Sequence, residues 1–281
     1  LLNETLWPNQ PLGRSLTGTE KTLNFLTRDR LIDYRQRNYV AHRTLFIATG
    51  RLKHKSVVQA VMRIANRFTQ GESPKFIPAS GNHQLKPRVR LFTKKTEQTQ
   101  MALGIRTCSR HDPRRFALRL LNTILGENMS SRLFQVVRED RGLAYSIYSS
   151  LSYFDDVGSL TISAGLDVKN LTKSLKLIRR ELELLIKAPP SAAEFRRARD
   201  YVLGQIDLGL ESTDNQMMWL GEQLLGYGRI IPPAEIKRRL SQVKPAEIRA
   251  VAREFFRPER FNLALVSPLK SDRGLAELLK M

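Results

Sequence analysis

The chain has 281 residues, of which 41% are hydrophobic and 26% charged, enough to bury the core of one large domain or two smaller ones. Its single cysteine, Cys108, excludes an intrachain disulfide and any metal site built from paired cysteines. No apolar run is long enough for a transmembrane helix.

The formal net charge of +20 is compatible with nucleic acid, an anionic membrane surface or acidic peptides as partners, or with a solvated basic surface alone. The basic residues are spread along many predicted helices. The chain shows neither the aromatic–basic interleaving of a single-strand platform nor a zinc-finger motif. We therefore expect no specific nucleic-acid partner.

Hydrophobic periodicity and Gly/Pro punctuation predict an alternation of helices and strands, broken by one composition-defined linker. In the first part these are a helix end and loop (1–18), a helix (22–39) with a second start near Thr27, a buried strand (43–50), an amphipathic helix (54–68) and the linker (70–87). The second part begins with two strands (88–92, 100–107) and a helix (113–125). A hairpin (145–154, 158–166), helices (168–187, 191–210, 213–225, 233–243, 245–256), a strand (260–267) and a last helix (269–280) follow.

Residues 129–150 form a helix-to-strand hinge in this prediction. Ser130 and Ser131 precede an apolar run, so their hydroxyls are expected to accept hydrogen bonds from the first helical turn. Gly142 is expected to end that helix in the left-handed conformation. Tyr145 then begins a strand, on the same face as Ile147.

An internal repeat predicts the architecture. The segment that begins at Leu31 aligns without a gap with the segment that begins at Ile248, and both combine a helix, a turn, a strand and Leu-Lys before another helix. We therefore expect an α+β fold, an antiparallel sheet with helices packed on one face, in two duplicated units. Residues 1–69 would be the C-terminal tail of the first unit, residues 70–87 the linker, and residues 88–281 the second unit.

Two motifs carry a resemblance to a known family. The first is W-P-N-Q-P-L-G-R at residues 7–14, followed by G-T-E at residues 18–20. The second is S-S-R-L-F-Q-V-V-R-E-D-R-G-L-A-Y-S at residues 130–146, followed by D-D-V-G at 155–158 and I-S-A-G at 162–165. Together they resemble the pitrilysin/insulinase-type zinc peptidases, in particular the bacterial and mitochondrial-processing-peptidase-like branch, over nearly the whole chain.

The resemblance implies that Arg138 and Tyr145 occupy the positions of an Arg/Tyr pair that binds substrate. A phenol hydroxyl can donate to a substrate carbonyl or a developing oxyanion, and a guanidinium can hold a carbonyl or a carboxylate. Ser130, Ser131 and Arg132 are weaker candidates for lining a substrate chamber, with helix capping as their alternative role.

The family's zinc site is expected outside this chain. The resemblance places it on an H-x-x-E-H motif upstream of the W-P motif, whereas the histidines here lie in no such motif and no two have i, i+4 spacing. These histidines are His42, His54, His83 and His111. We expect zinc in the intact enzyme, but no catalytic residue and no metal ligand in this chain. Cys108, with Arg106, Arg110 and His111 nearby in sequence, has neighbours that could lower its thiol pKa, but no catalytic partner.

Two functions are compatible with these motifs. The chain is either the C-terminal part of a zinc-dependent endopeptidase, inactive alone, or a non-catalytic structural subunit of a processing-peptidase-like complex. Expected partners are a peptide or unfolded-protein substrate, a zinc-bearing half or subunit, and a second copy of the chain. A third hypothesis, that the chain binds nucleic acid or an anionic surface, rests on the net charge of +20 alone. The localisation stays open among bacterial cytoplasm, periplasm and organelle matrix.

Overall fold

This computed structural model describes residues 1–68, 70–71, 76–81 and 84–280. Its contacts divide the chain into a sheet unit, made of Leu1–Arg14, Ala79–Gly204 and Pro233–Met281, and a helical unit, made of Ser15–Pro78 and Gln205–Pro232. The predicted boundaries after residues 69 and 87 concern a duplication rather than contacts, and they stay a prediction. Within the described ranges, no helix is long and apolar enough to cross a membrane.

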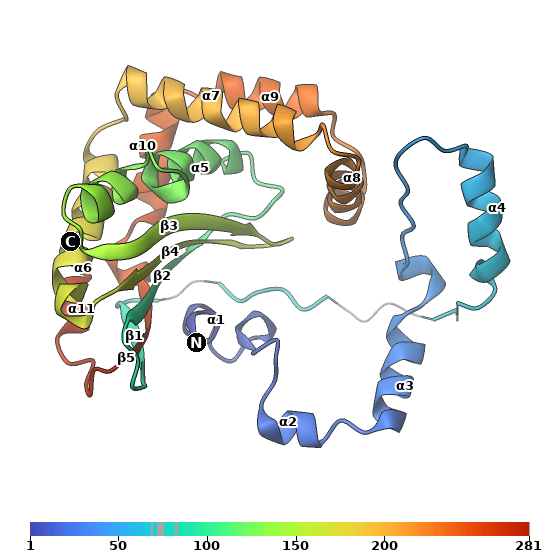
Figure 1. Cartoon of the computed structure of the whole chain (residues 1–281), viewed down its shortest axis with the longest axis horizontal. Coiled ribbons are helices and arrows are strands. Elements are labelled where there is room, and N and C mark those ends of the chain that lie inside the picture. The colour runs from blue at the N-terminus through green and yellow to red at the C-terminus, as the bar shows by residue number, and fades with distance from the viewer. Residues whose placement is uncertain (69, 72–75, 82–83, 281) are drawn as a thin grey trace. The chain divides into compact units, whose positions relative to one another are not determined.

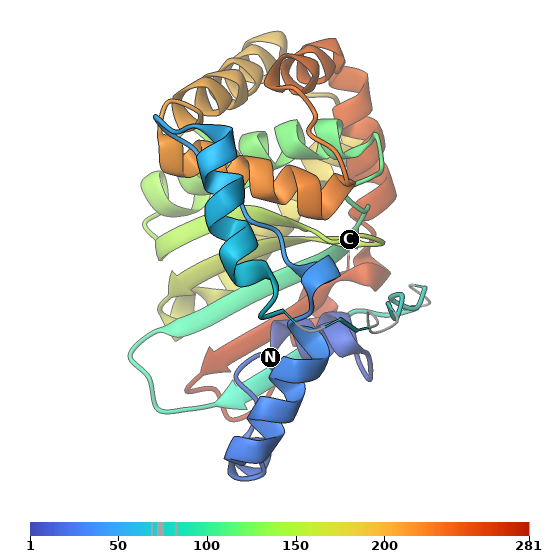
Figure 2. The ribbon, with the colours of Figure 1, turned by 90° about the vertical axis from the view of Figure 1, so that its right-hand side faces the viewer.

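A five-stranded sheet organises the sheet unit, in the order β1-β5-β2-β4-β3 (Figures 1 and 2). β1 and β5 run parallel, whereas the other neighbouring pairs are antiparallel. The α+β prediction is confirmed, with one parallel pair as the difference. The strands are β1 (Arg88–Thr93), β2 (Thr99–Thr107), β3 (Ala144–Tyr153), β4 (Gly158–Leu166) and β5 (Asn262–Ser267).

Helices cover one face of this sheet, because alternate strand residues direct apolar side chains to that side. On β2, Met101, Leu103 and Ile105 are buried in this way. α10 contacts both α5 and α6, and it also contacts β2 (Figure 1). The helices of this unit are α1 (Leu2–Leu6), α5 (Arg115–Asn122), α6 (Leu171–Lys187), α9 (Pro233–Gln242), α10 (Pro245–Phe255) and α11 (Leu275–Leu278), with α7 (Ala192–Gly209) beginning in it.

α1 lies on the opposite face, over β1, β5 and β2. A side chain at Gly104 would meet Leu2 and Leu6 at about 3 Å, so glycine allows this close approach. The Arg106 Nε donates to the Leu6 carbonyl at 2.7 Å, at the end of the helix. Burial and the neighbouring Arg88 lower the pKa of Arg106 to about 10, so it stays protonated at neutral pH. A buried cation therefore holds α1 on the sheet.

The helical unit contains α2 (Glu20–Asn24), α3 (Arg28–Asn38), α4 (His54–Ala65) and α8 (Thr213–Tyr227). The helix predicted over residues 22–39 is divided in two, and the Thr27 side chain caps the second part by accepting from Arg30 N–H. The predicted strand at residues 43–50 is not formed. A single extended segment needs neighbouring strands to satisfy its backbone, and none pairs with it in the described part of the chain.

Most of the other predicted elements are confirmed at their positions. The hairpin forms with β3 and β4 in register from Ser146↔Gly165 to Tyr153↔Gly158. The last predicted helix is reduced to α11, because Gly274 takes a left-handed conformation with φ of 83° just before it. Residues 72–75 and 82–83 of the predicted linker lie outside the described residues.

Candidate functional site

The helix before the hinge ends at a glycine in the left-handed conformation, as the sequence predicts. The π-helical turn η4 (Phe134–Glu139) precedes Gly142, whose φ is +58°, a region that side chains disfavour. Gly142 N–H donates to the Arg138 carbonyl at 2.9 Å, and Leu143 N–H donates to the Val137 carbonyl at 3.0 Å. These bonds fix the chain direction between Arg138 and the start of β3.

Tyr145 occupies a β-bulge at the start of β3. Ala144 pairs with Leu166 and Ser146 pairs with Gly165, so Tyr145 is an additional residue without a partner on β4. The prediction that Tyr145 shares a face with Ile147 is therefore wrong: Ile147 is buried, whereas Tyr145 is 67% exposed. The bulge turns the phenol toward solvent.

Arg138 lies near the end of the π-helical turn η4, with its guanidinium half-exposed. Its Cζ lies 4.9 Å from the centre of the Phe134 ring, and its Nε lies 3.9 Å from a Glu139 carboxylate oxygen. The stacking on Phe134 orients the guanidinium, while the ion pair is at the limit of contact. Both members of the predicted pair therefore offer polar groups to solvent from the two sides of one hinge.

The weaker candidates lie at the other end of η4. The Arg132 guanidinium binds Glu194 of α7 through two hydrogen bonds of 2.7 and 2.8 Å. Ser131 is buried, and its hydroxyl donates to the Asn128 carbonyl instead of accepting from the first helical turn, so its predicted capping role is wrong. Ser130 is exposed, and its N–H donates to the Asn128 side chain at 2.9 Å. Ser130 alone of the three turns to solvent.

Sequence reasoning missed the structural role of Gly126 and Glu127. A side chain at Gly126 would lie 2.7 Å from the backbone nitrogen of Ser149 on β3, so only glycine fits this close approach. The Glu127 carboxylate accepts from Thr123 Oγ1 at 2.7 Å and pairs with Arg119. The hydrogen bonds of Glu127 and the close contact of Gly126 hold the kinked turn η3 (Thr123–Glu127) against the sheet. In the sequence, the single glycine of this turn was the only indication of that role.

A pocket of about 330 Å³ lies in the sheet unit between this turn and α7. Asn128, Met129 and Ser130 line one side, and Arg197 and Tyr201 line the other. It combines apolar walls with polar rims, so it offers a binding surface.

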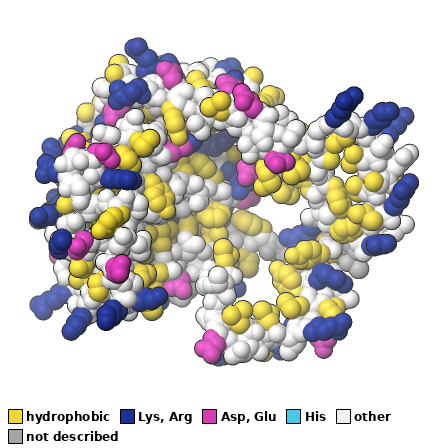
Figure 3. All heavy atoms as spheres, viewed as in Figure 1, with side chains coloured by type: hydrophobic (Ala, Val, Ile, Leu, Met, Phe, Trp, Pro, Cys, Tyr) yellow, Lys and Arg dark blue, Asp and Glu magenta, His cyan; other side chains and the backbone are white. Residues whose placement is uncertain are grey.

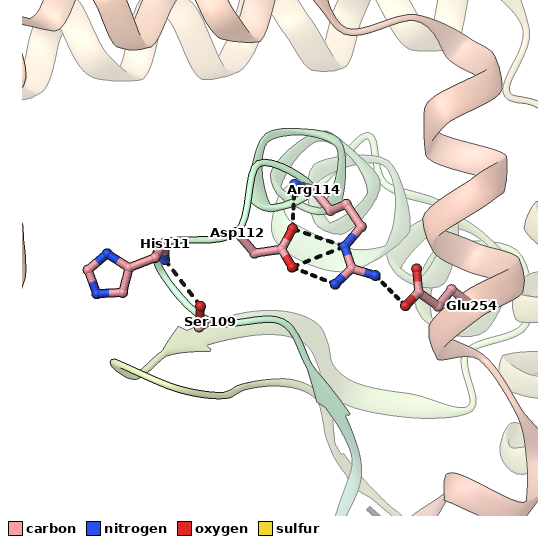
Figure 4. Close-up of polar contacts among 5 residues, drawn as sticks. All are labelled: Ser109, His111, Asp112, Arg114 and Glu254. Atoms are coloured by element: carbon pink, nitrogen blue, oxygen red, sulfur yellow. Dashed lines mark hydrogen bonds and ion pairs between the residues drawn. The ribbon is translucent and has the colours of Figure 1, made fainter. Parts of the chain in front are cut away.

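Ion pairs fix the loop between β2 and α5. Figure 4 shows the Arg114 guanidinium between the carboxylates of Asp112 and Glu254, with the His111 ring directed away from them. The hydrogen bonds from Arg114 hold the pKa of Asp112 below its ordinary value. Glu254 belongs to α10, so the pair joins the loop to the helical layer.

Cys108 precedes this loop and is buried. Burial raises its thiol pKa to about 11, which outweighs the cationic neighbours and corrects the expectation that they lower it. The thiol is protonated at neutral pH and is a poor nucleophile.

The side chains that could bind a metal are not arranged as a zinc site in the described part of the chain. Across residues 1–68, 70–71, 76–81 and 84–280, no three His, Cys, Asp or Glu side chains come together in a group that could hold a metal ion. His83, one of the histidines considered, lies outside those ranges. No step of chemistry is assigned to zinc on the described residues.

The sheet face opposite the helices is open over β3 and β4. Tyr148 lies opposite Ser163, and Ser150 lies opposite Thr161, so hydroxyl groups dominate this face. Tyr148 is 51% exposed and Ser150 is also exposed. Neither β3 nor β4 contains Asp, Glu, Lys or Arg. We call this surface the open face; it is neutral and rich in hydrogen-bonding groups.

Comparisons of the chain with known proteins agree on one family. Residues 26–202 match the family model described as "Peptidase M16 inactive domain". A protein of Mycobacterium tuberculosis H37Rv is 34% identical over 278 residues, which are 98% of this chain and 63% of that protein. A protein of Streptomyces coelicolor is 35% identical over 279 residues, 98% of this chain and 61% of that protein. Both carry the name uncharacterized zinc protease. The chain thus spans less than two thirds of the length of these relatives.

Solved structures share the fold. The peptidase M16 inactive domain from Pseudomonas fluorescens has a TM-score of 0.85 at 20% identity, covering 96% of this chain and 65% of the other. A protease from Helicobacter pylori has a TM-score of 0.84 at 18% identity, covering 95% and 65%. The chain belongs to the pitrilysin-type M16 peptidase family, of which it carries the inactive, C-terminal type of domain.

Proposed function

We propose that the chain is the C-terminal part of a zinc endopeptidase and that its open face forms one wall of the substrate chamber. The relatives that share 34–35% identity with nearly the whole chain are named zinc proteases. The zinc-bearing part lies in the region that these relatives have beyond the match, or on a separate subunit. The chain alone does not hydrolyse peptides under this proposal.

The exposure of both side chains at the hinge is the single observation that carries the proposed role of the chain. Tyr145 is turned to solvent by a bulge, and Arg138 is stacked on Phe134 with part of its guanidinium exposed. A strand tyrosine that served packing would instead be buried. An exposed phenol and guanidinium at one hinge suit an extended peptide, because the phenol donates to one carbonyl and the guanidinium holds a second carbonyl or a carboxylate.

The test uses the assembled enzyme with a quenched fluorescent peptide. Arg138→Ala and Tyr145→Phe should each lower kcat/KM about 10- to 100-fold, because a hydrogen bond that involves a charged group contributes about 1.5–3 kcal/mol. Arg141→Ala is the matched control, because Arg141 is an exposed arginine of the same hinge. Its kcat/KM should stay within about twofold of wild type.

Two results would contradict the proposal. Wild-type kcat/KM in both hinge variants would remove the substrate role of the pair. Chelator-sensitive hydrolysis by the 281-residue chain alone would show that the metal site lies within it. A full-length protein that lacks the zinc motif and activity would favour the alternative, a non-catalytic partner subunit of a processing-peptidase-like complex.

A further inference from the structure

One glycine interrupts the row of polar side chains on the open face. Gly165 lies inside β4 and pairs with Ser146 of β3 on one side and with Gln100 of β2 on the other. Both neighbours are exposed and alternate with the buried Ile147 and Met101, so they lie on the open face. A glycine in a strand interior packs no side chain, and it often marks a place where a ligand approaches the backbone closely.

Polar side chains of the neighbouring strands meet above this glycine. A Cβ at position 165 would lie 3.2 Å from Gln98 Oε1, 3.2 Å from Ser146 Oγ and 3.5 Å from Gln100 Nε2. Gln100 Nε2 also donates to Gln98 Oε1 at 3.4 Å. We call Gln98, Gln100, Ser146 and Gly165 the amide cluster. Because position 165 carries no side chain, two amides and a hydroxyl can gather at one point of the sheet surface.

The backbone that carries these side chains is fixed. The Thr96 hydroxyl donates to the Gln98 carbonyl at 2.8 Å, which closes the turn just before β2. Thr99 follows, and its buried hydroxyl lies 2.7 Å from the Ser267 hydroxyl of β5. Gln98 is therefore held from both sides. Groups that are already positioned lose less conformational freedom when a ligand binds.

The amide cluster lies beside the hinge. Ser146 directly follows Tyr145, so their Cα atoms are about 3.8 Å apart. The bulge that turns Tyr145 to solvent lies between the pairs Ala144↔Leu166 and Ser146↔Gly165, and the second of these pairs belongs to the cluster. Bulges are frequent next to active sites because they redirect a side chain. A peptide held by the Tyr145 phenol therefore runs within reach of the cluster.

The cluster offers hydrogen-bond donors and acceptors but no charge. Each glutamine amide has two N–H donors and a carbonyl acceptor, and the Ser146 hydroxyl can act in either role. The contact between the two amides uses one donor and one acceptor position, and the others stay available to a ligand. A side-chain amide is the complementary group, because it donates and accepts at the same time. An aliphatic side chain would instead displace water from these groups without replacing its hydrogen bonds.

We propose that the amide cluster is a subsite that takes an asparagine or glutamine side chain of the peptide substrate. This inference rests on the proposed function, because it assigns a preference to the same chamber wall. Glutamine and leucine are both neutral and similar in size. The positive field of the chain therefore does not discriminate between them, and a comparison of the two measures the cluster alone.

The first test measures hydrolysis by the assembled enzyme. Quenched fluorescent peptides of one length carry glutamine or leucine at each position in turn. At one position, kcat/KM should be at least about 5-fold higher with glutamine, as expected for the net gain of one or two neutral hydrogen bonds. Gln100→Leu should reduce this ratio to about twofold or less while leaving kcat/KM for the leucine peptide within about twofold of wild type.

Gly165→Ala tests the geometry of the cluster without removing any polar group. Its Cβ would lie too close to the Gln98 and Ser146 side chains, so these must move apart. The ratio should again fall to about twofold or less. Gln205→Leu is the matched control, because Gln205 is an exposed glutamine of α7 outside the sheet, and it should leave the ratio unchanged. If Gly165→Ala does not fold, Gln100→Leu, a change at an exposed position, still decides the test.

Binding to the 281-residue chain gives a second measurement that needs no hydrolysis. By fluorescence anisotropy, the preferred glutamine peptide should bind at least about 5-fold more tightly than its leucine counterpart, and Gln100→Leu should remove the difference. The proposal is overturned if no position favours glutamine, or if the preference persists in Gln100→Leu. Equal loss for the glutamine and leucine peptides would also overturn it, because it would indicate contact with the peptide backbone.

Failure of this inference is distinguishable from failure of the proposed function. Loss of activity in Arg138→Ala and Tyr145→Phe, together with a glutamine preference that Gln100→Leu does not change, would contradict the subsite alone. A full-length protein without peptidase activity would contradict the proposed function. The anisotropy measurement would then still decide whether the amide cluster selects a side-chain amide.

Discussion

At the scale of single residues, two glycines of the sheet unit stand in opposite environments. A Cβ at Gly126 would meet Ser149 at 2.7 Å from its backbone nitrogen, whereas a Cβ at Gly204 in α7 would meet nothing within 4 Å. Gly126→Ala should therefore lower the free energy of unfolding by about 1–3 kcal/mol, because the turn and β3 must move apart. Urea unfolding followed by circular dichroism measures this change.

Gly204→Ala is the matched control for this prediction. Replacing a helical glycine by alanine reduces the backbone entropy of the unfolded chain and should raise the free energy of unfolding by up to about 1 kcal/mol. Equal effects of the two substitutions would show that the close contact of Gly126 with β3 has no energetic consequence.

Residue chemistry was predictable from the sequence only where it depends on local pattern. The left-handed Gly142 follows from its place after an amphipathic run, and its φ of +58° confirms it. The exposure of Tyr145 depends on a bulge, which exists only in the pairing of β3 with β4. The pKa of Cys108 depends on burial by residues distant in sequence, so nearby arginines gave the wrong direction.

At the scale of elements, Arg132 joins the start of η4 to both α7 and α6. It binds Glu194 of α7 through two short hydrogen bonds, and lies 3.8 Å from Glu181 of α6. Glu194→Gln should lower the free energy of unfolding by about 2–3 kcal/mol, because it removes the negative charge and one of the two acceptors that a largely buried guanidinium needs. Thermal and urea unfolding at pH 7 measure the loss.

Glu181→Gln, which changes the second carboxylate near Arg132, should affect stability differently. Burial raises the pKa of Glu181, so its charged form costs stability at neutral pH, and the folded state gains stability as the pH falls toward the ordinary glutamate value of about 4.3. The amide removes this dependence, so stability at pH 7 should change by less than about 1 kcal/mol. The gap between the variant and wild type should depend on pH in that window; a gap independent of pH would contradict the assignment.

Elements were predicted well where one chain segment supplies its own stabilisation. The helices follow from apolar periodicity, and the β3–β4 hairpin from two alternating runs around D-D-V-G. Residues 43–50 have the apolar run of a buried strand, but a strand needs neighbours, and hydrophobicity alone cannot report whether they are present. The π-helical turns η3 and η4 were missed because they depend on packing against β3.

At the scale of the whole molecule, the net charge of +20 predicts which peptides the chain would attract. Figure 3 shows Lys and Arg side chains distributed over the visible surface rather than gathered in one patch. The open face carries hydroxyl groups and no carboxylate. A surface of this kind attracts acidic segments through its long-range field and repels basic ones, while the face itself adds no opposing charge.

The chain should therefore bind an acidic extended peptide about 10-fold more tightly than a basic peptide of equal length at low salt, as measured by fluorescence anisotropy. Because the attraction acts over a Debye length, the ratio should fall to about twofold or less at 0.5 M salt. Ser150→Asp places a charge on the open face and should reduce the preference, whereas Ser271→Asp, an exposed serine outside the strands, should not. Equal loss in both variants would indicate that total charge alone selects the peptide, without a contribution from the open face.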